Sequence, residues 1–376
     1  MRIGIDARFF GPKQKGLGRY SQKLIENLEE IDQDSNDEYY IFLRRQNFDY
    51  FKPINRRFKK VLAEYSWYGW KEQLIFPLLL NKHKIDLMHF CHFNVPIFYR
   101  KRFVVTIHDL ILFHFPTIKN TTLNRIQYFF KMMMYHLVIR SATKRAVKII
   151  TISNYVKEDI KKELKIADEK IIVTKEGFDL NSFFDSVDYQ TIFKKYDIIN
   201  SYLLYVGNAY PHKNLEKLCD AFIEIRRKYL DMNLVIVGGE DYFFNKLKQY
   251  IKINQIDGVI FPGFVSDKEL DAFYRGAKVF VFPSLYEGFG LPPLEALAKG
   301  IAVVSSNRTS MPEILGDTVQ YFDPESTDSI VKNIITVLES ENRRKEIIKK
   351  GEERLKMFSW KKMAQKTLDV YRSAMM

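Results

Sequence analysis

The stretch FPSLYEGFGLPPLEALAKG, residues 282–300, places Glu287 and Glu295 eight positions apart, across two glycines and two prolines. We expect a strand, a loop and then a helix, because proline fits the first helical turn, where N–H groups have no intrahelical acceptor. The loop amides and the positive end of the helix favour a phosphate or a sugar oxygen. These amides belong to Gly288, Phe289, Gly290 and Leu291. Two carboxylates would repel a phosphate, so we expect them to accept hydrogen bonds from sugar hydroxyls on either side of it.

Short apolar runs alternate with helical patterns on both sides of this stretch. Strands are predicted at 2–7, 39–43, 86–90, 102–109, 147–153, 201–207, 233–239, 258–263, 278–284 and 301–306. Helices are predicted at 18–31, 122–146, 214–229, 242–254, 266–277 and 293–300. The alternation predicts an α/β protein with two Rossmann-like domains, each a doubly wound parallel sheet. The polar stretch 179–191 separates domains 1–180 and 181–357, and ligands are expected in a cleft between them, at the carboxyl ends of the strands.

The composition excludes several classes of protein. With 46 % hydrophobic and 28 % charged residues, the chain is typical of a folded protein and not of a disordered one. Cys91 and Cys219 are far apart in apolar surroundings, so neither a disulfide framework nor a cysteine-rich metal site is expected. Charges interrupt the apolar N-terminus, and the longest apolar run, 74–80, is shorter than the about 20 residues that span a bilayer. We therefore expect a cytoplasmic protein.

The net charge of +13 is concentrated in the first half of the chain. Residues 1–180 contain 32 lysines and arginines against 20 aspartates and glutamates, whereas residues 181–376 contain 27 against 26. A basic first domain indicates an anionic partner, such as a membrane surface, a nucleic acid or a phosphorylated substrate. A solvated surface that keeps the protein soluble explains the same charge without a partner.

The stretch PSLYEGFGLPPLEALAKGIAVVSS (283–306) resembles the signature of the retaining nucleotide-sugar glycosyltransferases of family 4, the glycogen-synthase and lipopolysaccharide type. Other stretches follow in the family's order: GLGRY (16–20), VTIHD (105–109), ISNYVKEDI (152–160), LLYVGNAYPHKNLEKLCDAF (203–222) and FPGFVSDKELDAFYRGAKVFVFPS (261–284). The resemblance implies the GT-B fold, in which two Rossmann-like domains face each other across a cleft. It also implies that a last helix, here within 358–376, crosses back onto the first domain.

The resemblance assigns roles around the opening stretch. Glu295 would bind the ribose hydroxyls of the nucleotide, and Glu287 would bind a hydroxyl of the transferred sugar. Contacts with the sugar and the diphosphate would come from the amides of Phe289, Gly290 and Leu291. The base would be lined by a strand end, at Gly263, Phe264 and Val265.

Lys213 lies just before the helix predicted at 214–229, and the resemblance makes it the cation that neutralises the leaving diphosphate. A lysine at a helix start is also explained as a solvated charge. Asn214 is a suitable N-cap residue. The family often carries an arginine soon after the strand glycine or directly before this lysine, where this chain has Asn208 and His212. A neutral imidazole is a weaker charge partner than arginine. Arg275 and Arg308 are candidate substitutes.

Two further groups are expected in the first domain. Gly16 and Gly18 follow a strand and open a helix, so their amides, with the charge of Arg19, are expected to reach the donor phosphate or the acceptor. His108 and Asp109 end a strand. The resemblance places His108 against the donor sugar and assigns no base role to Asp109.

No metal site is expected. Asp32-Gln33-Asp34 has the spacing of the metal motif in a different glycosyltransferase fold, but it follows a helix in a polar loop. The histidines of the first domain lack zinc-site spacing and neighbouring thiolates.

The predicted helix 122–146 interleaves basic residues with aromatic residues and three methionines. It allows two interpretations. In the first, the helix meets an anionic lipid surface or a lipid-linked acceptor. In the second, its apolar face packs on the sheet and its basic face is solvated.

Taken together, the resemblance implies a retaining, metal-independent glycosyltransferase without a cofactor, acting on the inner face of the membrane in surface polysaccharide synthesis. The donor would be a nucleoside-diphosphate sugar, GDP- or UDP-linked, with GDP-mannose as the first choice, and the acceptor a glycan or a lipid-linked hydroxyl. The alternative is a nucleotide-sugar-binding or interaction protein that has lost transfer activity. A Rossmann dehydrogenase is disfavoured, because no strand is followed by GxGxxG with a later acidic residue. A nucleic-acid binder is disfavoured as well, since no known motif of that class is present.

Overall fold

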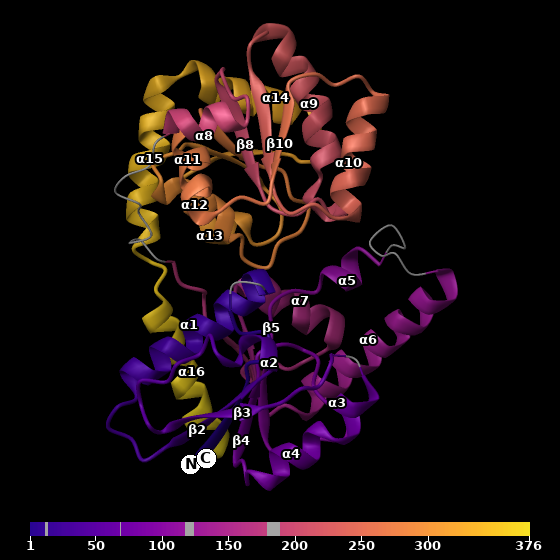
Figure 1. Ribbon diagram of the computed structural model, residues 1–376, viewed down its shortest axis with the longest axis vertical. Coiled ribbons are helices and arrows are strands. Elements are labelled where there is room, and N and C mark those ends of the chain that lie inside the picture. The colour runs from indigo at the N-terminus through magenta and orange to yellow at the C-terminus, as the bar shows by residue number, and fades with distance from the viewer. Residues whose placement is uncertain (12–13, 68, 117–123, 179–188) are drawn as a thin grey trace. The chain divides into compact units, whose positions relative to one another are not determined.

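The computed structural model describes residues 1–11, 14–67, 69–116, 124–178 and 189–376, which form two compact units (Figure 1). Unit 1 comprises Met1–His114, Leu123–Gly177 and Phe358–Met376, and unit 2 comprises Phe115–Thr122 and Phe178–Met357. The boundary expected at 179–191 falls mostly on residues 179–188, which lie outside the described residues.

Unit 1 contains a seven-stranded sheet with the strand order β3-β2-β1-β4-β5-β6-β7, and all neighbouring strands are parallel. The strands are β1 (Arg2–Asp6), β2 (Glu38–Leu43), β3 (Phe58–Leu62), β4 (Leu87–Phe90), β5 (Phe103–Ile107), β6 (Lys148–Thr151) and β7 (Ile171–Val173). The five predicted strands are confirmed as the five central ones. The sequence missed both edge strands, because β3 carries two lysines and β7 has only three residues.

The longer helices of unit 1 confirm the two that were predicted there. They are α1 (Lys15–Ile31), α6 (Arg125–Arg145), α7 (Asn154–Leu164) and α16 (Trp360–Met375). Short helices are α2 (Arg45–Phe48), α3 (Trp70–Leu74), α4 (Phe76–Lys82) and α5 (Ile111–His114). One face of α6 packs into the same apolar core as α4 and the sheet, as Met132, Ile139 and Phe76 illustrate.

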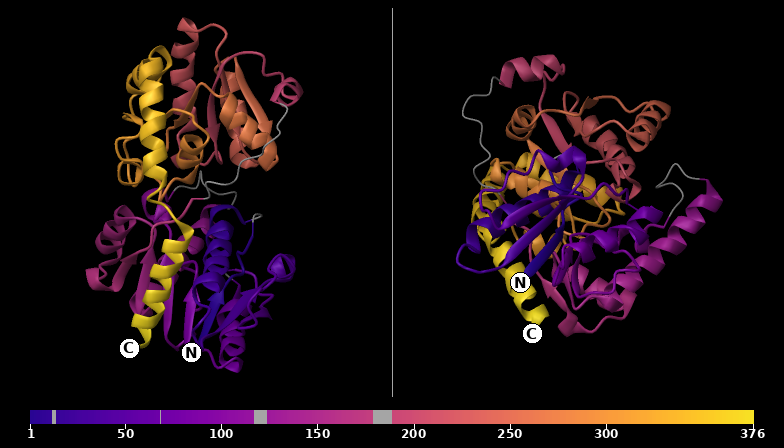
Figure 2. Two further views of the ribbon diagram at one scale, coloured as in Figure 1. Left: turned by 90° about the vertical axis from the view of Figure 1, so that its left-hand side faces the viewer. Right: turned by 60° about the horizontal axis from the view of Figure 1, so that its bottom comes forward.

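The C-terminal helix α16 belongs to unit 1 and packs against α1, as the left view of Figure 2 shows. His89 on β4 is buried, and its Nδ1 lies 2.6 Å from the Tyr371 hydroxyl on α16. Lys361 Nζ lies 2.5 Å from Glu30 Oε1 on α1. Where the chain leaves unit 1, a Cβ on Gly177 would lie 2.0 Å from the backbone nitrogen of Trp360, so only glycine fits this contact.

Unit 2 contains a six-stranded parallel sheet with the order β10-β9-β8-β11-β12-β13. Its strands are β8 (Tyr202–Val206), β9 (Asn233–Val237), β10 (Val259–Gly263), β11 (Val279–Phe282), β12 (Val303–Ser306) and β13 (Gln320–Phe322). The five predicted strands are confirmed, and only the three-residue edge strand β13 was missed. Two doubly wound parallel sheets are therefore the observed fold class.

The helices of unit 2 cover both faces of its sheet. They are α8 (Tyr189–Lys195), α9 (Leu215–Lys228), α10 (Tyr242–Ile253), α11 (Asp267–Gly276), α12 (Leu291–Ala298), α13 (Met311–Leu315), α14 (Thr327–Glu339) and α15 (Glu341–Leu355). The Ser266 side chain accepts from the Glu269 amide and the Glu269 side chain accepts from the Ser266 amide, so α11 starts with a capping box.

Candidate active site

The segment from β11 to α12 forms the strand, loop and helix that its sequence predicts. The strand ends at Phe282, and α12 begins at Leu291 with proline in its first turn. Gly290 is the N-cap, with a φ of +90°, and a Cβ there would lie 2.4 Å from Met311 Cε. Glycine meets both conditions, because it adopts positive φ without strain and leaves space for the neighbouring side chain.

Two neighbouring turns hold the loop between β11 and α12 in place. The Glu287 amide donates to Thr309 Oγ1 at 3.1 Å, and Ser310 Oγ donates to the Glu287 carbonyl at 2.9 Å. The Leu285 amide donates to the His212 carbonyl at 2.8 Å. Sequence reasoning missed Thr309 and Ser310, although the polar run that follows the predicted strand 301–306 was the available signal.

Asn214 joins three turns at the carboxyl edge of the sheet. Its side-chain amide donates to the Pro283 carbonyl at 3.2 Å and to the Pro324 carbonyl at 2.8 Å. Asn214 is confirmed as the N-cap residue of α9, but it has a φ of +61° and its side chain caps no amide of the helix. The side chain instead links the loops that follow β8, β11 and β13.

The centre of the site is an ion pair between two residues that the sequence placed in separate motifs. Lys213 Nζ lies 2.5 Å from Glu287 Oε1, and the two side chains are 13 % and 11 % exposed. Opposite charges at this distance and degree of burial attract each other much more strongly than they would in bulk water. The fold therefore brings together Lys213 and Glu287, which are 74 positions apart in the chain.

Burial keeps two side chains next to this ion pair uncharged at neutral pH. Burial lowers the pKa of His212 to about 3, and the positive charge of Lys213 adds to the effect, so the imidazole is neutral at pH 7. Burial also raises the pKa of the Tyr205 hydroxyl well above its ordinary range, with the charge of Glu287 adding to it. Lys213 is therefore the cation of the turn 211–213, and His212 supplies no positive charge.

Glu295 lies in α12, eight positions after Glu287. It is half-buried, and the Tyr274 hydroxyl on α11 donates to Glu295 Oε2 at 3.0 Å. The two glutamates thus come from different local structures, one from the loop and one from the helix. The order of strand, loop and helix predicted from the sequence places Glu287 in the loop and Glu295 in the helix, as observed.

The residues expected to line a nucleotide base follow β10 on the same sheet. Gly263 has a φ of +79°, and its carbonyl accepts from the Gly238 amide at 3.2 Å. Phe264 is 87 % exposed, whereas Val265 is buried. These residues and the ion pair all follow strands of one parallel sheet at its carboxyl edge, where ligands of such sheets bind.

The two arginines named as substitutes for a missing cation lie at opposite edges of the sheet. Arg275 is in the last turn of α11, just before β11 begins, and its Nε lies 2.9 Å from Asp271 Oδ2. Arg308 follows β12 at the carboxyl edge, and its Nη2 lies 2.9 Å from Asp323 Oδ1 and 2.7 Å from Glu325 Oε2. Of the two, only Arg308 lies at the edge that carries the ion pair, and it is bound to two carboxylates.

The candidate residues of unit 1 lie at the carboxyl edge of its own sheet. Gly16, Gly18 and Arg19 are in the first turns of α1. A Cβ on Gly18 would lie 2.0 Å from the Gly11 carbonyl, so packing alone requires glycine there. Among the described residues, nothing lies within 4 Å of a Cβ on Gly16, so their packing does not explain that glycine.

His108 follows β5 and is held by backbone and side-chain contacts within unit 1. Its Nε2 lies 3.0 Å from the Cys91 carbonyl, and its Nδ1 lies 3.6 Å from Glu176 Oε1. The Tyr20 ring packs edge-on against the imidazole at 4.7 Å between centroids. Sequence reasoning named His108 but missed Glu176, which is buried beside it.

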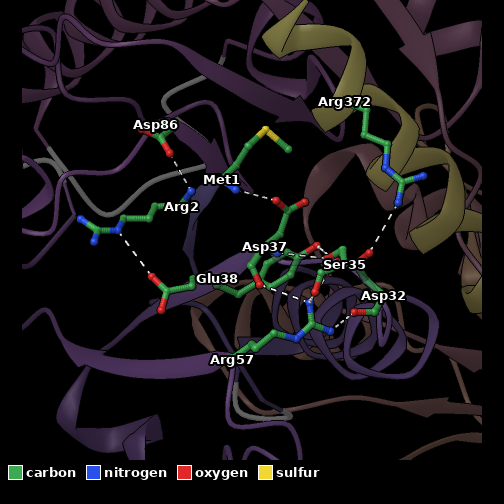
Figure 3. Close-up of polar contacts among 10 residues, drawn as sticks. Met1, Arg2, Asp32, Ser35, Asp37, Glu38, Arg57, Asp86 and Arg372 are labelled. Carbon is green, nitrogen blue, oxygen red and sulfur yellow. Dashed lines mark hydrogen bonds and ion pairs between the residues drawn. The ribbon is translucent and has the colours of Figure 1, made fainter.

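Asp32, from the motif with metal-binding spacing, is a structural residue (Figure 3). It is buried, and it accepts hydrogen bonds from the Tyr39 hydroxyl at 2.7 Å and from Ser35 Oγ at 2.6 Å. Arg372 of α16 lies 3.5 Å from its other oxygen, and Arg57 donates to its carbonyl. These contacts explain the aspartate without a metal.

Within the part of the chain that the structure describes, no three His, Cys, Asp or Glu side chains gather closely enough to hold a metal ion. None of the helices in that part combines the length and the apolar character needed to cross a bilayer.

Two family models match the chain. Glycosyltransferase Family 4 matches residues 15–182, which cover most of unit 1. Glycosyl transferases group 1 matches residues 188–354, which cover most of unit 2 and the whole segment from Lys213 to Glu295.

Characterised relatives and solved structures agree with these matches. The chain is 28 % identical over 380 residues to O-antigen chain mannosyltransferase B of Escherichia coli, covering 95 % of this chain and 96 % of that protein. It is 28 % identical over 342 residues to O-antigen chain mannosyltransferase RfbU of Salmonella typhimurium, covering 86 % and 88 %. The structure of Anabaena HepE in complex with UDP-glucose has a TM-score of 0.74 at 16 % identity, covering 99 % and 100 %, which is a likeness of fold.

Proposed function

Because the chain belongs to the family 4 and group 1 glycosyltransferases, we propose that it transfers a hexose from a nucleoside-diphosphate sugar to a hydroxyl of a glycan or lipid-linked acceptor in surface polysaccharide synthesis. The observation that carries the proposal is the ion pair of Lys213 and Glu287 at the carboxyl edge of the unit 2 sheet. A cation and a carboxylate in contact suit a ligand that combines a diphosphate with sugar hydroxyls.

In the proposed complex, the donor lies along the segment from Glu287 to Glu295. Glu295 accepts hydrogen bonds from the ribose hydroxyls, and Glu287 accepts one from the transferred sugar. The amides of residues 288–291 and the N-terminal end of α12 face the diphosphate, because both favour negative charge. The base lies against Gly263, Phe264 and Val265. Gly16, Gly18, Arg19 and His108 of unit 1 complete the donor site.

The proposed reaction retains the configuration of the sugar and uses no metal. The bond between the sugar C1 and the leaving phosphate oxygen breaks, and a bond from C1 to the acceptor oxygen forms on the same face. The acceptor hydroxyl gives its proton to the leaving phosphate. Lys213 exchanges its contact with Glu287 for the diphosphate and stabilises the negative charge that develops there. His212 donates no charge, which leaves Lys213 and the loop amides as the stabilising groups.

We propose mannose, carried by GDP, as the first donor to test. The names of the two O-antigen relatives support mannose. The HepE complex supports a nucleoside-diphosphate sugar in general, with UDP as the other nucleotide. We also propose a cytoplasmic protein whose basic first domain makes peripheral contact with an anionic membrane, where a lipid-linked acceptor would be found.

One observation supports a second candidate, a nucleotide-sugar-binding protein without transfer activity. The position where the family often carries an arginine holds the neutral His212, and Arg308 is already bound to two carboxylates. A chain of this kind would bind a donor without releasing its nucleoside diphosphate.

Two glutamate variants test the proposal. Glu295→Ala should weaken binding of the nucleoside diphosphate about 10- to 100-fold, because hydrogen bonds to a charged group contribute about 1.5–3 kcal/mol and each 1.4 kcal/mol is a factor of about ten. Glu287→Ala should leave that binding nearly intact and mainly reduce sugar transfer. Calorimetry with GDP and UDP measures the first effect, and release of nucleoside diphosphate from a panel of donor sugars measures the second.

The exposed Glu353 on α15 provides the matched control, since Glu353→Ala removes a carboxylate that pairs with Lys356 at the surface. Unchanged nucleotide binding in Glu295→Ala would contradict the assignment of the ribose site. Donor binding without release of nucleoside diphosphate from any sugar would support the second candidate.

A further inference from the structure

Helix α6 is apolar on two opposite faces. Its inner face packs into the core of unit 1 through Tyr128, Met132, Tyr135, Ile139 and Ala142, and Val138 is buried as well. Its outer face carries six large apolar side chains that are between 43 % and 71 % exposed, namely Ile126, Phe129, Phe130, Met133, Met134 and Leu137. The sequence left open whether the apolar residues of this helix pack on the sheet or meet lipid. Packing on the sheet explains the residues of the inner face but not the six exposed residues of the outer face.

The outer side chains form one continuous stripe. Residues 126, 130, 133 and 137 are separated by three or four positions, which places them in line along one side of a helix. The same spacing continues to Arg140 and Lys144, and both are exposed. The outer face of α6 is therefore apolar in its first half and basic in its second half. The apolar half is about 17 Å long at 1.5 Å per residue.

The loop after β4 extends the basic end of this face. Arg145 Nη2 donates to the Pro96 carbonyl at 3.2 Å, and another nitrogen of the same guanidinium donates to the Tyr99 carbonyl. The loop is thus fastened to the C-terminal end of α6. It presents Phe98, which is 56 % exposed, and the exposed Arg100 and Lys101.

Acidic residues are missing from the whole region. Residues 110–157 contain eight lysines and arginines and no aspartate or glutamate. The positive charge of the outer face is therefore not neutralised by carboxylates of its own segment. A surface with negative charge at its boundary and hydrocarbon beneath matches the basic half and the apolar half at once.

We propose that the outer face of α6, with the loop 96–102 at its basic end, docks unit 1 on an anionic lipid bilayer. This deepens the membrane contact of the proposed function and rests on it. The apolar half enters the boundary between headgroups and acyl chains, and Arg140, Lys144 and Arg100 meet the lipid phosphates. Figure 1 shows α6 on the outside of unit 1, where it is the longest helix.

A second copy of the chain fits this face less well. If two outer faces paired in parallel, Arg140 and Lys144 would meet the same cations of the partner. If they paired in antiparallel fashion, these cations would lie against the apolar half and lose their water. On a bilayer, the apolar half of the face lies among the acyl chains and the basic half lies among the headgroups. Neither the repulsion between like charges nor the desolvation of the cations then arises.

The test is sedimentation of the full chain with lipid vesicles. Phosphatidylcholine vesicles are compared with vesicles that also contain phosphatidylglycerol, at low and at high salt. We expect binding to the anionic vesicles only, weakened by salt. Phe130→Ser with Leu137→Ser should lower vesicle affinity at least about tenfold, and Arg140→Gln with Lys144→Gln should do the same and reduce the salt dependence.

Leu230→Ser with Ile253→Ser is the control, because these apolar residues of unit 2 are 75 % and 78 % exposed and lie outside the proposed face. It should bind vesicles like the wild type. Equal binding to neutral vesicles, or unchanged binding by the α6 variants, would overturn the proposal. So would a lipid-free dimer, seen by analytical ultracentrifugation, that the α6 substitutions dissociate. Calorimetry with GDP and UDP separates this result from a failure of the proposed function, since the α6 variants should bind nucleotide normally.

Discussion

Unit 1 contains 35 lysines and arginines against 20 aspartates and glutamates, whereas unit 2 contains 24 against 26. The two units share a doubly wound parallel sheet, so the fold does not require this difference. Net charge affects how a surface attracts partners and has little influence on the fold itself. The excess of positive charge in unit 1 suits contact with an anionic surface. The near-equal numbers of positive and negative charges in unit 2 suit a site in which single charged side chains contact one ligand.

The buried ion pairs of the two units differ in how completely their surroundings enclose them. In unit 1, Arg8 and Glu72 are fully buried with 2.7 Å between Nη2 and Oε1. Asp6 bonds the same guanidinium, and Asn94 donates to both oxygens of Glu72. In unit 2, the pair of Lys213 and Glu287 keeps some exposure to solvent. The first pair is enclosed by further polar partners, and the second can exchange its contact for a ligand.

The largest effect on stability should come from the enclosed pair. Glu72→Gln keeps the shape of the side chain but removes one of the two charges that compensate Arg8. Its amide nitrogen also cannot accept the hydrogen bond that Asn94 donates to a carboxylate oxygen. Breaking a buried pair typically costs about 3–5 kcal/mol, because the remaining charge stays buried. We expect the free energy of unfolding to fall by that amount in urea titrations.

Glu64 provides the control in unit 1. It pairs with Arg44 at 2.9 Å but is 46 % exposed, and exposed pairs contribute about 0–1 kcal/mol. Glu64→Gln should therefore change the free energy of unfolding little. A similar loss in both variants would show that the enclosure of Glu72 does not matter.

Loss of the ion pair in unit 2 should have a small effect on stability and a large effect on sugar transfer. Lys213→Gln should lower the free energy of unfolding by less than about 2 kcal/mol, between the values for exposed and for buried pairs. It should reduce sugar transfer about 10²–10³-fold, the usual effect of losing one group that stabilises developing charge. Lys248→Gln is the control, since Lys248 pairs with Glu240 at the surface of α10. Full transfer activity in Lys213→Gln would reject the role of Lys213.

The sequence predicts the fold well where strands are central and buried. All ten predicted strands are present, because a parallel strand covered on both faces reads as an uninterrupted apolar run. The missed strands are edge strands, where one side of the ladder is open and a strand such as FKKVL can carry lysines. Helices α14 and α15 were also missed, although serine caps start both.

The candidate site was predicted residue by residue but not as a set of contacts. Lys213 and Glu287 were named from separate motifs, and their contact depends on β8 and β11 being neighbours in the sheet, which local patterns do not reveal. The polar core of unit 1 was missed for the same reason. Arg8 appeared only as a charge that interrupts the N-terminus, and its partner Glu72 lies 64 positions away.

The two units also differ in their buried histidines, which should make the free energy of unfolding depend on pH. The expected effect of each histidine is smaller than that of the ion pair of Arg8 and Glu72. Unit 1 buries His89, whose ring bridges Thr106 and Tyr371, and unit 2 buries His212. Burial lowers the pKa of His89, of His92 in unit 1 and of His212 to about 3 in each case. Among the described residues, unit 1 therefore contains two histidines with a pKa this low and unit 2 contains one. Burial also lowers the pKa of His83 and His136 in unit 1.

The sign of the effect follows from the proton count. Below pH 6.5 the unfolded chain binds a proton at each of these histidines and the folded chain does not, so stability falls as the pH is lowered from 6.5 toward 3. Each imidazole should cost about 2 kcal/mol between pH 6.5 and 5, at about 1.4 kcal/mol per pH unit.

Tryptophan fluorescence can follow this loss in unit 1 alone, because Trp67, Trp70 and Trp360 all belong to it. We expect the urea midpoint measured by fluorescence to fall as the pH is lowered from 6.5 to 5. The fall should be smaller in His89→Asn, which removes one of the imidazoles that burial keeps neutral. An equal fall in the variant and the wild type would mean that His89 is not held neutral by the fold, and the contact between β4 and α16 would then have to tolerate a charged imidazole.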